Sequence, residues 1–207
     1  MTVILIDEIK PRKGHLTGLY AQGELICAFD SDLAAEKGLK AGQEYPVDFL
    51  RELLGESQLR RARSKALYLL EYRDYSARDM TVRLKKDFDE LSAQTAVDYL
   101  MEIGAIDDFR YAENMIRHLL QQKHYGKRRI MQELAAKGID RDTAEDALAS
   151  FDMDESAAIM ELLEKKFSLD LADDKGIRRT VAALQRYGYH SSDIWEALRE
   201  YRDAEEE

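Results

Sequence analysis

The chain of 207 residues is poor in cysteine, in proline and in long hydrophobic runs. Its single cysteine, Cys27, cannot form an intramolecular disulfide, so the chain suits a reducing compartment as readily as any other. The apolar run at the N-terminus ends at Ile6, before the acidic Asp7, and is too short for a signal peptide or a membrane span. We therefore expect a cytoplasmic protein without a membrane segment.

An excess of positive charge is also absent. The chain has 31 lysines and arginines against 41 aspartates and glutamates, a formal net charge of -10. This balance argues against a protein that coats nucleic acid by bulk charge, which usually needs a basic domain or stripe. The charge is uneven, however: residues 123–137 carry five positive and one negative side chains, a net of +4, and residues 138–176 carry four positive and twelve negative, a net of -8. Local basic patches are therefore compatible with the acidic total.

The first 46 residues differ from the rest, because they hold both prolines and five of the eleven glycines. Short apolar runs at 3–6, 16–20 and 25–29 are separated by turn-forming residues, a pattern typical of strands. A short helix is expected around 32–37. Residues 1–54 are thus predicted to form an N-terminal extension with two or three β-strands, which must pack on another element because so few strands are only marginally stable alone.

From about Val47 the apolar period changes from 2 to 3.6 residues, which predicts amphipathic helices with one buried face each. Start and stop signals divide this part into about nine helices. The expected N-terminal caps are Ser76, Ser92, Asp108, Asp140, Asp154 and Ser191, and the expected C-terminal glycines are Gly104, Gly138 and Gly188. The fold class is therefore mainly α.

Internal repetition organises the helical part. The segment 125–138 recurs 50 residues later at 175–188, with glycine, the Arg-Arg pair, leucine and glycine in the same places. A weaker match 50 residues earlier includes Arg78 and Leu84. We expect three tandem three-helix repeats, at 55–106, 107–152 and 153–207, the last with an acidic tail. Stacking of the copies predicts an elongated, curved body that presents a long surface rather than a pocket.

Side chains arranged for catalysis are missing from the sequence. No Gly-x-x-x-x-Gly-Lys-Ser/Thr or Gly-x-Gly-x-x-Gly loop occurs, and the four histidines have no metal-ligand spacing. Asp107-Asp108 is better explained as a helix cap than as a carboxylate pair for acid–base work. Cys27 lies in a strand-like apolar run without a base nearby, which favours a buried structural thiol over a nucleophile. We therefore expect no enzyme, no catalytic residue, no metal and no cofactor.

Several strings, in their order within the triple repeat, resemble one family. In the central copy these are Asp107-Asp108-Phe109-Arg110-Tyr111-Ala112, Tyr125-Gly126-Lys127-Arg128-Arg129-Ile130 and Lys137-Gly138-Ile139. The flanking copies add Lys65-Ala66-Leu67-Tyr68-Leu69-Leu70, Arg73-Asp74-Tyr75-Ser76, Arg178-Arg179 and Tyr187-Gly188-Tyr189. Over roughly residues 55–202 the chain looks like the RecX family, the bacterial regulators of the RecA recombinase. Residues 38–42 are similar to the extension that longer members carry ahead of the repeats.

The resemblance implies a modulator without enzymatic activity that lodges in the helical groove of the RecA filament on single-stranded DNA. It would inhibit strand exchange and ATP-dependent filament extension, and would thereby regulate homologous recombination, DNA repair and the SOS response. Composition and periodicity alone show only a helical repeat protein.

Three groups of basic residues are the candidate partner- or DNA-binding sites: Arg60, Arg61, Arg63 and Lys65; Lys127, Arg128 and Arg129 beside Tyr125; and Arg178 and Arg179. The second and third groups open the second helix of successive repeats, so stacking should place them along related edges as an intermittent basic track. Arginine forks there would meet phosphates of filament-bound DNA or carboxylates of the recombinase. The alternative is a solvated face with i,i+4 ion pairs such as Arg129 with Glu133, each worth about 0.2 to 0.5 kcal/mol. Tyr125 would stack on bases, whereas most tyrosines at helical spacing belong to a core or its rim.

Two other functions stay open at this point. Units that resemble a helix-turn-helix would read duplex DNA, which predicts strongly salt-dependent binding to naked duplex and fits poorly with a net charge of -10. A helical scaffold for an unrelated protein would bind other partners and no recombinase. We expect a monomer whose direct contact with DNA is weak.

Overall fold

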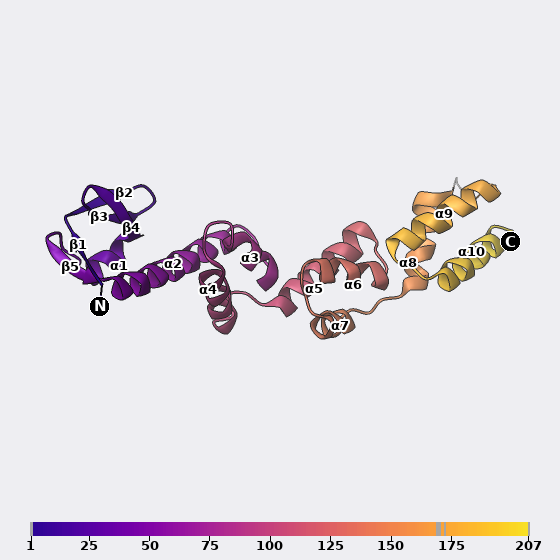
Figure 1. The fold of residues 1–207 in the computed structure, drawn as a ribbon. Coiled ribbons are helices and arrows are strands. Elements are labelled where there is room, and N and C mark those ends of the chain that lie inside the picture. The colour runs from indigo at the N-terminus through magenta and orange to yellow at the C-terminus, as the bar shows by residue number, and fades with distance from the viewer. Residues whose placement is uncertain (1, 169–170, 172, 207) are drawn as a thin grey trace. The chain divides into compact units, whose positions relative to one another are not determined.

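The computed structural model describes residues 2–168, 171 and 173–206, and the chain divides into two compact units, Met1–Ile106 and Asp107–Glu207. Figure 1 shows a small sheet at the N-terminal end of the first unit and helices from there onward. No helix in the described part of the chain is long and apolar enough to cross a membrane.

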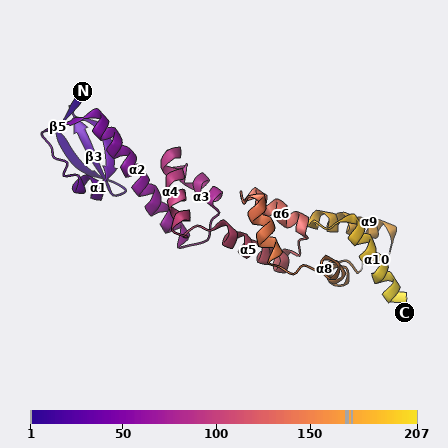
Figure 2. The same cartoon turned by 90° about the horizontal axis from the view of Figure 1, so that it is seen from below.

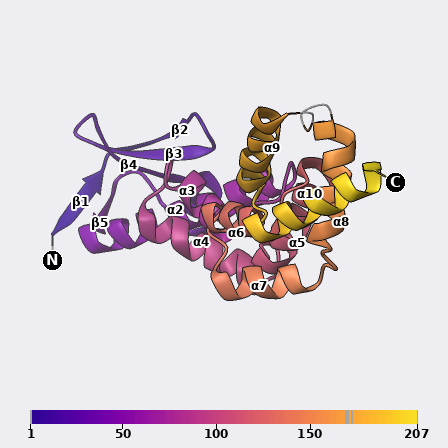
Figure 3. The same cartoon turned by 90° about the vertical axis from the view of Figure 1, so that its right-hand side faces the viewer.

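Two antiparallel sheets open the first unit. Strand β1 (Val3–Ile6) pairs with β5 (Gln43–Pro46), and β2 (Glu8–Arg12), β3 (Leu16–Ala21) and β4 (Glu24–Asp30) form a three-stranded sheet in the order β2-β3-β4, which is seen in Figure 3. The strand-containing extension is confirmed, and the three predicted strands are β1, β3 and β4. Strands β2 and β5 were not predicted because their sequences, EIKPR and QEYP, are mostly polar and each contains a proline.

The sheets pack on a long helix, as the instability of so few strands predicts. Helix α1 (Ser31–Glu36) is capped by the side chain of Asp30, which precedes it, and α2 runs over Val47–Leu70. Figure 2 shows the start of α2 beside the sheet. A core of Ile6, Leu19, Phe29, Leu33, Ala34, Leu50 and Leu53 joins strands, α1 and α2. The boundary predicted at 54/55 lies inside α2, which continues through it, and the four predicted domain ranges stay predictions.

The second half of α2 belongs to a three-helix group with its own core. It packs on α3 (Ala77–Leu84) and α4 (Glu90–Glu102) through residues that include Ala62, Ala66, Met80, Leu84, Val97 and Leu100. Ser76 caps α3 as predicted. The predicted cap at Ser92 is wrong: Asp89 caps α4, and the Ser92 backbone and hydroxyl groups both donate to its carboxylate. The ionised carboxylate of Asp89 is a stronger acceptor for these groups at the helix start than a serine hydroxyl.

The second unit contains two further three-helix groups. The first has α5 (Asp108–His118), extended by the π-helical turn η1 (Leu119–Lys123), then α6 (Lys127–Ala136) and α7 (Arg141–Ala149). The second has α8 (Glu155–Leu162) with the π-helical turn η2 (Leu163–Phe167), then α9 (Asp174–Tyr187) and α10 (Ser191–Glu206). Within the described residues, the helices α2 to α10 correspond to the nine helices that the start and stop signals of the sequence predict.

The repeat predicted at an offset of 50 residues is visible in the packing. Leu134 and Leu184 are both fully buried in the cores of their own groups. Gly138 and Gly188 both have positive φ, at 80° and 102°, where a glycine is favoured. Asp140 and Asp154 cap α7 and α8 as predicted, whereas α5 is capped by Asp107 and not by its neighbour Asp108.

Candidate partner-binding surface

The basic residues of α2 are engaged within the first unit. Arg60 donates from Nη1 to both carboxylate oxygens of Glu36 at 2.9 Å and lies 3.5 Å from an oxygen of Asp30. It therefore ties α2 to α1. The hydrogen bond that Arg60 donates to Glu36, together with the nearby carboxylates, raises the pKa of Arg60, so this guanidinium is held as a cation.

The other three members of this group are also in contact with their own unit. Arg61 and Arg63 lie over the rings of Phe88 and Tyr99, at 5.5 and 4.1 Å from the ring centroids. Lys65 forms an ion pair with Asp87, and its hydrogen bond lowers the pKa of that carboxyl group. These contacts join α2 to α4 and to the segment after α3. The basic group of α2 thus has a structural role within the first unit.

The second basic group occupies the first turn of α6. Gly126 precedes the helix and offers no side-chain cap, so the Lys127 backbone N–H donates instead to Oε1 of Glu155, at 2.6 Å. Arg128 donates from Nη2 to the backbone oxygen of Gln185, at 3.1 Å. Arg129 forms the predicted ion pair with Glu133, at 2.5 Å. Cations in a first helical turn oppose the helix dipole, so their position there is not explained by helix stability.

A close backbone contact places this group beside α9. The Gly126 N–H donates to the backbone carbonyl oxygen of Tyr187 at 2.9 Å. The hydroxyl of the buried Tyr189 donates to the backbone carbonyl oxygen of His124, also at 2.9 Å. Gly188 lies so close to α6 that an added Cβ would be 2.5 Å from the backbone nitrogen of Arg129. The loop between α9 and α10 is therefore docked on the start of α6. Sequence repetition marks both glycines but does not reveal that they touch.

The third basic group lies at the other end of α9. Arg178 and Arg179 are exposed in its first turns, and Arg178 has no hydrogen bond or ion pair with another described residue. Arg128 contacts α9 at Gln185. Gln185 stands seven residues after Arg178 in the same helix, which is an axial separation of about 10 Å at a rise of 1.5 Å per residue. The second basic group therefore contacts α9 near its C-terminal end, and the third group lies near the N-terminal end of the same helix.

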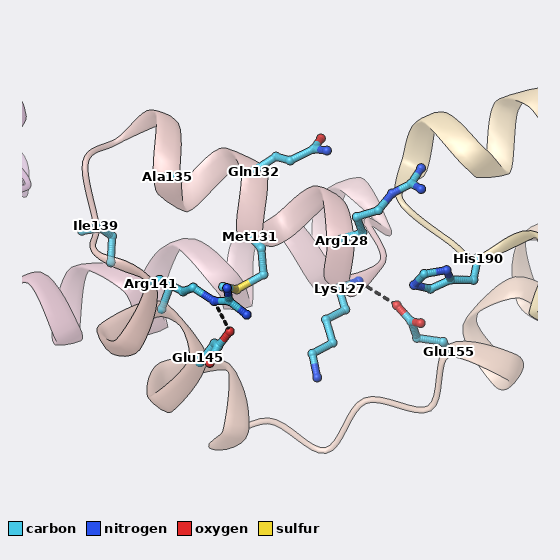
Figure 4. A pocket seen from close by; sticks show the side chains of 11 residues that line it. Lys127, Arg128, Met131, Gln132, Ala135, Ile139, Arg141, Glu145, Glu155 and His190 are labelled. Carbon is cyan, nitrogen blue, oxygen red and sulfur yellow. Dashed lines mark hydrogen bonds and ion pairs between the residues drawn. The ribbon is translucent and has the colours of Figure 1, made fainter.

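Two open pockets flank α6. The first, of about 570 Å³, has an apolar floor that includes Met131, Ala135 and Ile139, and Figure 4 shows Lys127 and Arg128 leaving the start of α6 in different directions around it. Its rim also carries an Arg141–Glu145 ion pair of 2.7 Å and the carboxylate of Glu155. This pocket is therefore mixed in charge.

The second pocket lies between α6 and α9, has a volume of about 700 Å³, and will be called the α6–α9 groove. It is lined by Tyr125, Arg128, Arg129, Gln132, Ala182, Gln185, Arg186 and Tyr187. Three of the predicted candidates therefore meet here. Arg186, Tyr187 and the two glutamines are not among the predicted candidates; of these, Arg186 lies in the last turn of α9, where the helix dipole already accounts for a basic residue.

Ligands for a metal ion are not gathered in the described part of the chain, where no group of three or more His, Cys, Asp or Glu side chains could hold one. Cys27 is partly buried between strands, and desolvation raises the pKa of its thiol to about 11, so the thiolate is disfavoured.

Known proteins are similar to this chain in sequence and in fold. Residues 107–148, which span α5, α6 and most of α7, match the family model described as RecX, second three-helix domain. The regulatory protein RecX of Trichlorobacter lovleyi is 33% identical over 132 residues, which cover 61% of this chain and 86% of the relative. The chain belongs to the RecX family. Regulatory protein RecX of Clostridioides difficile is 27% identical over 176 residues, covering 84% of this chain and 83% of that RecX.

Solved RecX structures have the same fold. The crystal structure of a regulatory protein RecX matches with a TM-score of 0.68 at 22% identity and covers 96% of this chain and 98% of its own. RecX from Lactobacillus salivarius matches with a TM-score of 0.63 at 23% identity and covers 70% and 97%. The RecX fold therefore extends over nearly the whole chain, including the N-terminal strands.

Proposed function

We propose that this RecX-family chain regulates the RecA recombinase, mainly as an inhibitor, by binding the RecA filament on single-stranded DNA. It acts by binding, without a catalytic step, and so regulates recombination, DNA repair and the SOS response. The observation that carries the proposal is the match to proteins named regulatory protein RecX over most of the length of both chains. The absence of a phosphate-binding loop from the sequence supports leaving ATP hydrolysis to the partner.

The filament-binding surface is proposed to centre on α6 and α9. The arginines and lysine of α2 are engaged with Glu36, Asp87 and aromatic rings of their own unit. The exposed Lys127 and Arg178, by contrast, have side chains without a hydrogen bond or ion pair to any other residue that the structure describes. A cation without an internal partner is available to a phosphate or carboxylate of the filament.

The test is RecA-driven ATP hydrolysis and strand exchange on single-stranded DNA, measured while purified full-length protein is added up to stoichiometric amounts. Both activities are expected to fall. If both stay unchanged and the protein does not sediment with the filament, the assignment is wrong. Full-length protein is required, because a version starting near Leu54 would cut α2 in the middle and remove the part that packs on the sheet.

Charge reversal identifies the surface. Arg128→Glu with Arg129→Glu is expected to weaken filament binding more than reversal of Lys165, which is paired with Glu161 on the face of α8. Lys166 is unsuitable as a control, because it contacts the ring and hydroxyl of Tyr187. An equal loss in both variants would mean that only general electrostatics matters.

A further inference from the structure

The α6–α9 groove differs from the neighbouring pocket in its chemistry. Its lining contains three arginines, two tyrosines and two glutamines, and no carboxylate. The pocket in Figure 4 is lined by two glutamates as well as by cations. In a chain of net charge -10, a lining with cations and without a carboxylate is a local exception. It favours an anionic ligand.

The aromatic side chains of the groove are arranged as a pair. The rings of Tyr125 and Tyr187 lie 5.8 Å apart between centroids and are tilted by 53°. Each is accompanied by a cation, since Arg129 lies 5.6 Å from the Tyr125 centroid and Lys166 lies 5.0 Å from that of Tyr187. Both tyrosines are only partly buried, so ring surface faces the groove. Partly exposed rings beside cations are the usual platform for unpaired bases.

The arginines of the groove are unequal. Arg128 and Arg129 are engaged with the Gln185 oxygen and with Glu133. Arg186 is exposed and has no hydrogen bond or ion pair with another described residue. Arg178 extends the same face of α9, because it stands four residues before the groove-lining Ala182. These two exposed arginines stand eight residues apart on α9, an axial separation of about 12 Å at a rise of 1.5 Å per residue.

We propose that the α6–α9 groove binds a segment of single-stranded nucleic acid, with bases against the tyrosine rings and phosphates on Arg186 and Arg178. Arginine forks suit phosphate oxygens, and glutamine side chains can donate to and accept from base edges. An acidic protein segment would use the cations but leave the aromatic and amide groups without a role. This inference rests on the proposed function in one respect: the DNA of the RecA filament is taken as the source of the single strand.

The test is direct binding of the full-length protein to a fluorescein-labelled oligothymidylate, followed by fluorescence anisotropy at low salt. Wild type is expected to bind, with an affinity that falls as salt rises because counterions are released. The double variant Arg178→Glu with Arg186→Glu is expected to weaken binding about tenfold, because two arginine–phosphate contacts are lost and the new carboxylates repel the phosphates. An abasic oligonucleotide of equal length is expected to bind about fivefold or more weakly than oligothymidylate, because bases no longer stack.

The control is Arg202→Glu, since Arg202 is exposed on α10 away from the groove lining. A single reversal there is expected to leave the affinity within about twofold, and circular dichroism checks that all variants are folded. The inference is overturned if wild type does not bind, if the double variant binds like Arg202→Glu, or if poly-L-glutamate displaces the strand as well as oligothymidylate does. Inhibition of RecA without strand binding would remove this inference alone, whereas strand binding without any effect on RecA would remove the proposed function alone.

Discussion

The basic residues of α2 and the arginines of α9 look alike in the sequence but have different surroundings in the structure. Arg60, Arg63 and Lys65 contact Glu36, Tyr99 and Asp87 in their own unit. Arg178 and Arg186 are exposed and have no hydrogen bond or ion pair with another residue of the described part. The difference teaches that basic residues in a sequence can be engaged in contacts within the fold, and that only those without an internal partner stay available to a ligand.

The difference has a physical cause in the position of each helix. Helix α2 packs its first part on the strand-containing region and its second half on α3–α4, so carboxylates and rings of both parts lie within reach of its basic residues. Helix α9 meets α6 through the docked loop at Gly188, which leaves the outer face of α9 beside an open groove. The internal pairing of these basic residues is therefore a consequence of the packing of α2 on two successive parts of its own unit.

The largest expected effect comes from breaking the junction that builds the groove. Gly188→Ala should destabilise the second unit by about 2 to 4 kcal/mol, because alanine is strained at φ 102° and its Cβ would overlap Arg129. Urea unfolding followed by circular dichroism measures this loss, and the fluorescence of Trp195, the only tryptophan, reports on the second unit.

Gly104→Ala is the matched control for that variant. Gly104 also has positive φ, at 70°, but a Cβ there would meet nothing within 4 Å. It should cost only about 1 to 2 kcal/mol, the strain of the backbone alone. If the two variants were equally stable, the close contact between Gly188 and α6 would be refuted.

A medium effect should separate the structural arginines from the free ones. Arg63→Ala is expected to lower the free energy of unfolding by about 1 to 2 kcal/mol, since it loses the stacking on Tyr99 and packing of its partly buried stem. Arg178→Ala should change it by less than about 0.5 kcal/mol, because the side chain is exposed. Urea unfolding followed by circular dichroism measures both. If Arg178→Ala lowered the free energy of unfolding more than Arg63→Ala does, the distinction between the structural and the exposed arginine would be wrong.

The smallest effect concerns pH. The hydrogen bond and charge of Lys65 lower the pKa of Asp87 in the folded state, so this pair stabilises the fold above the unfolded carboxyl pKa of about 3.9. That contribution is lost as the pH falls through the lowered folded pKa. Lys65→Met should raise the pKa of Asp87 toward its ordinary value and flatten the acid dependence of stability. A carboxyl titration by NMR would show no change if the ion pair were absent.

Much of the fold follows from the sequence, and less of the site does. The period of 3.6 residues and the glycines predict α2 to α10, and the offset of 50 residues predicts that Leu134 and Leu184 occupy equivalent cores. Strands β2 and β5 have too few apolar residues to be predicted. The π-helical turns η1 and η2 leave no signal, because their sequences continue those of α5 and α8 without a break.

The site depends on contacts between residues that are distant in the chain. Arg128 and Gln185 are 57 residues apart, and only the docking of Gly188 on α6 brings them together. Local sequence does predict the Arg129–Glu133 pair, which lies within one helical turn. It does not distinguish Arg63, stacked on Tyr99, from the exposed Arg178.

Co-sedimentation with RecA filaments on single-stranded DNA tests the central claim most directly, with wild type, Arg63→Ala and the double variant Arg178→Glu with Arg186→Glu compared side by side. Wild type and Arg63→Ala are expected to sediment equally with the filament at a temperature where both are folded. The double variant should need about tenfold more protein for the same bound fraction, because the cations that meet the filament are reversed. Wild type remaining in the supernatant, or a double variant that sediments like wild type, would contradict the account.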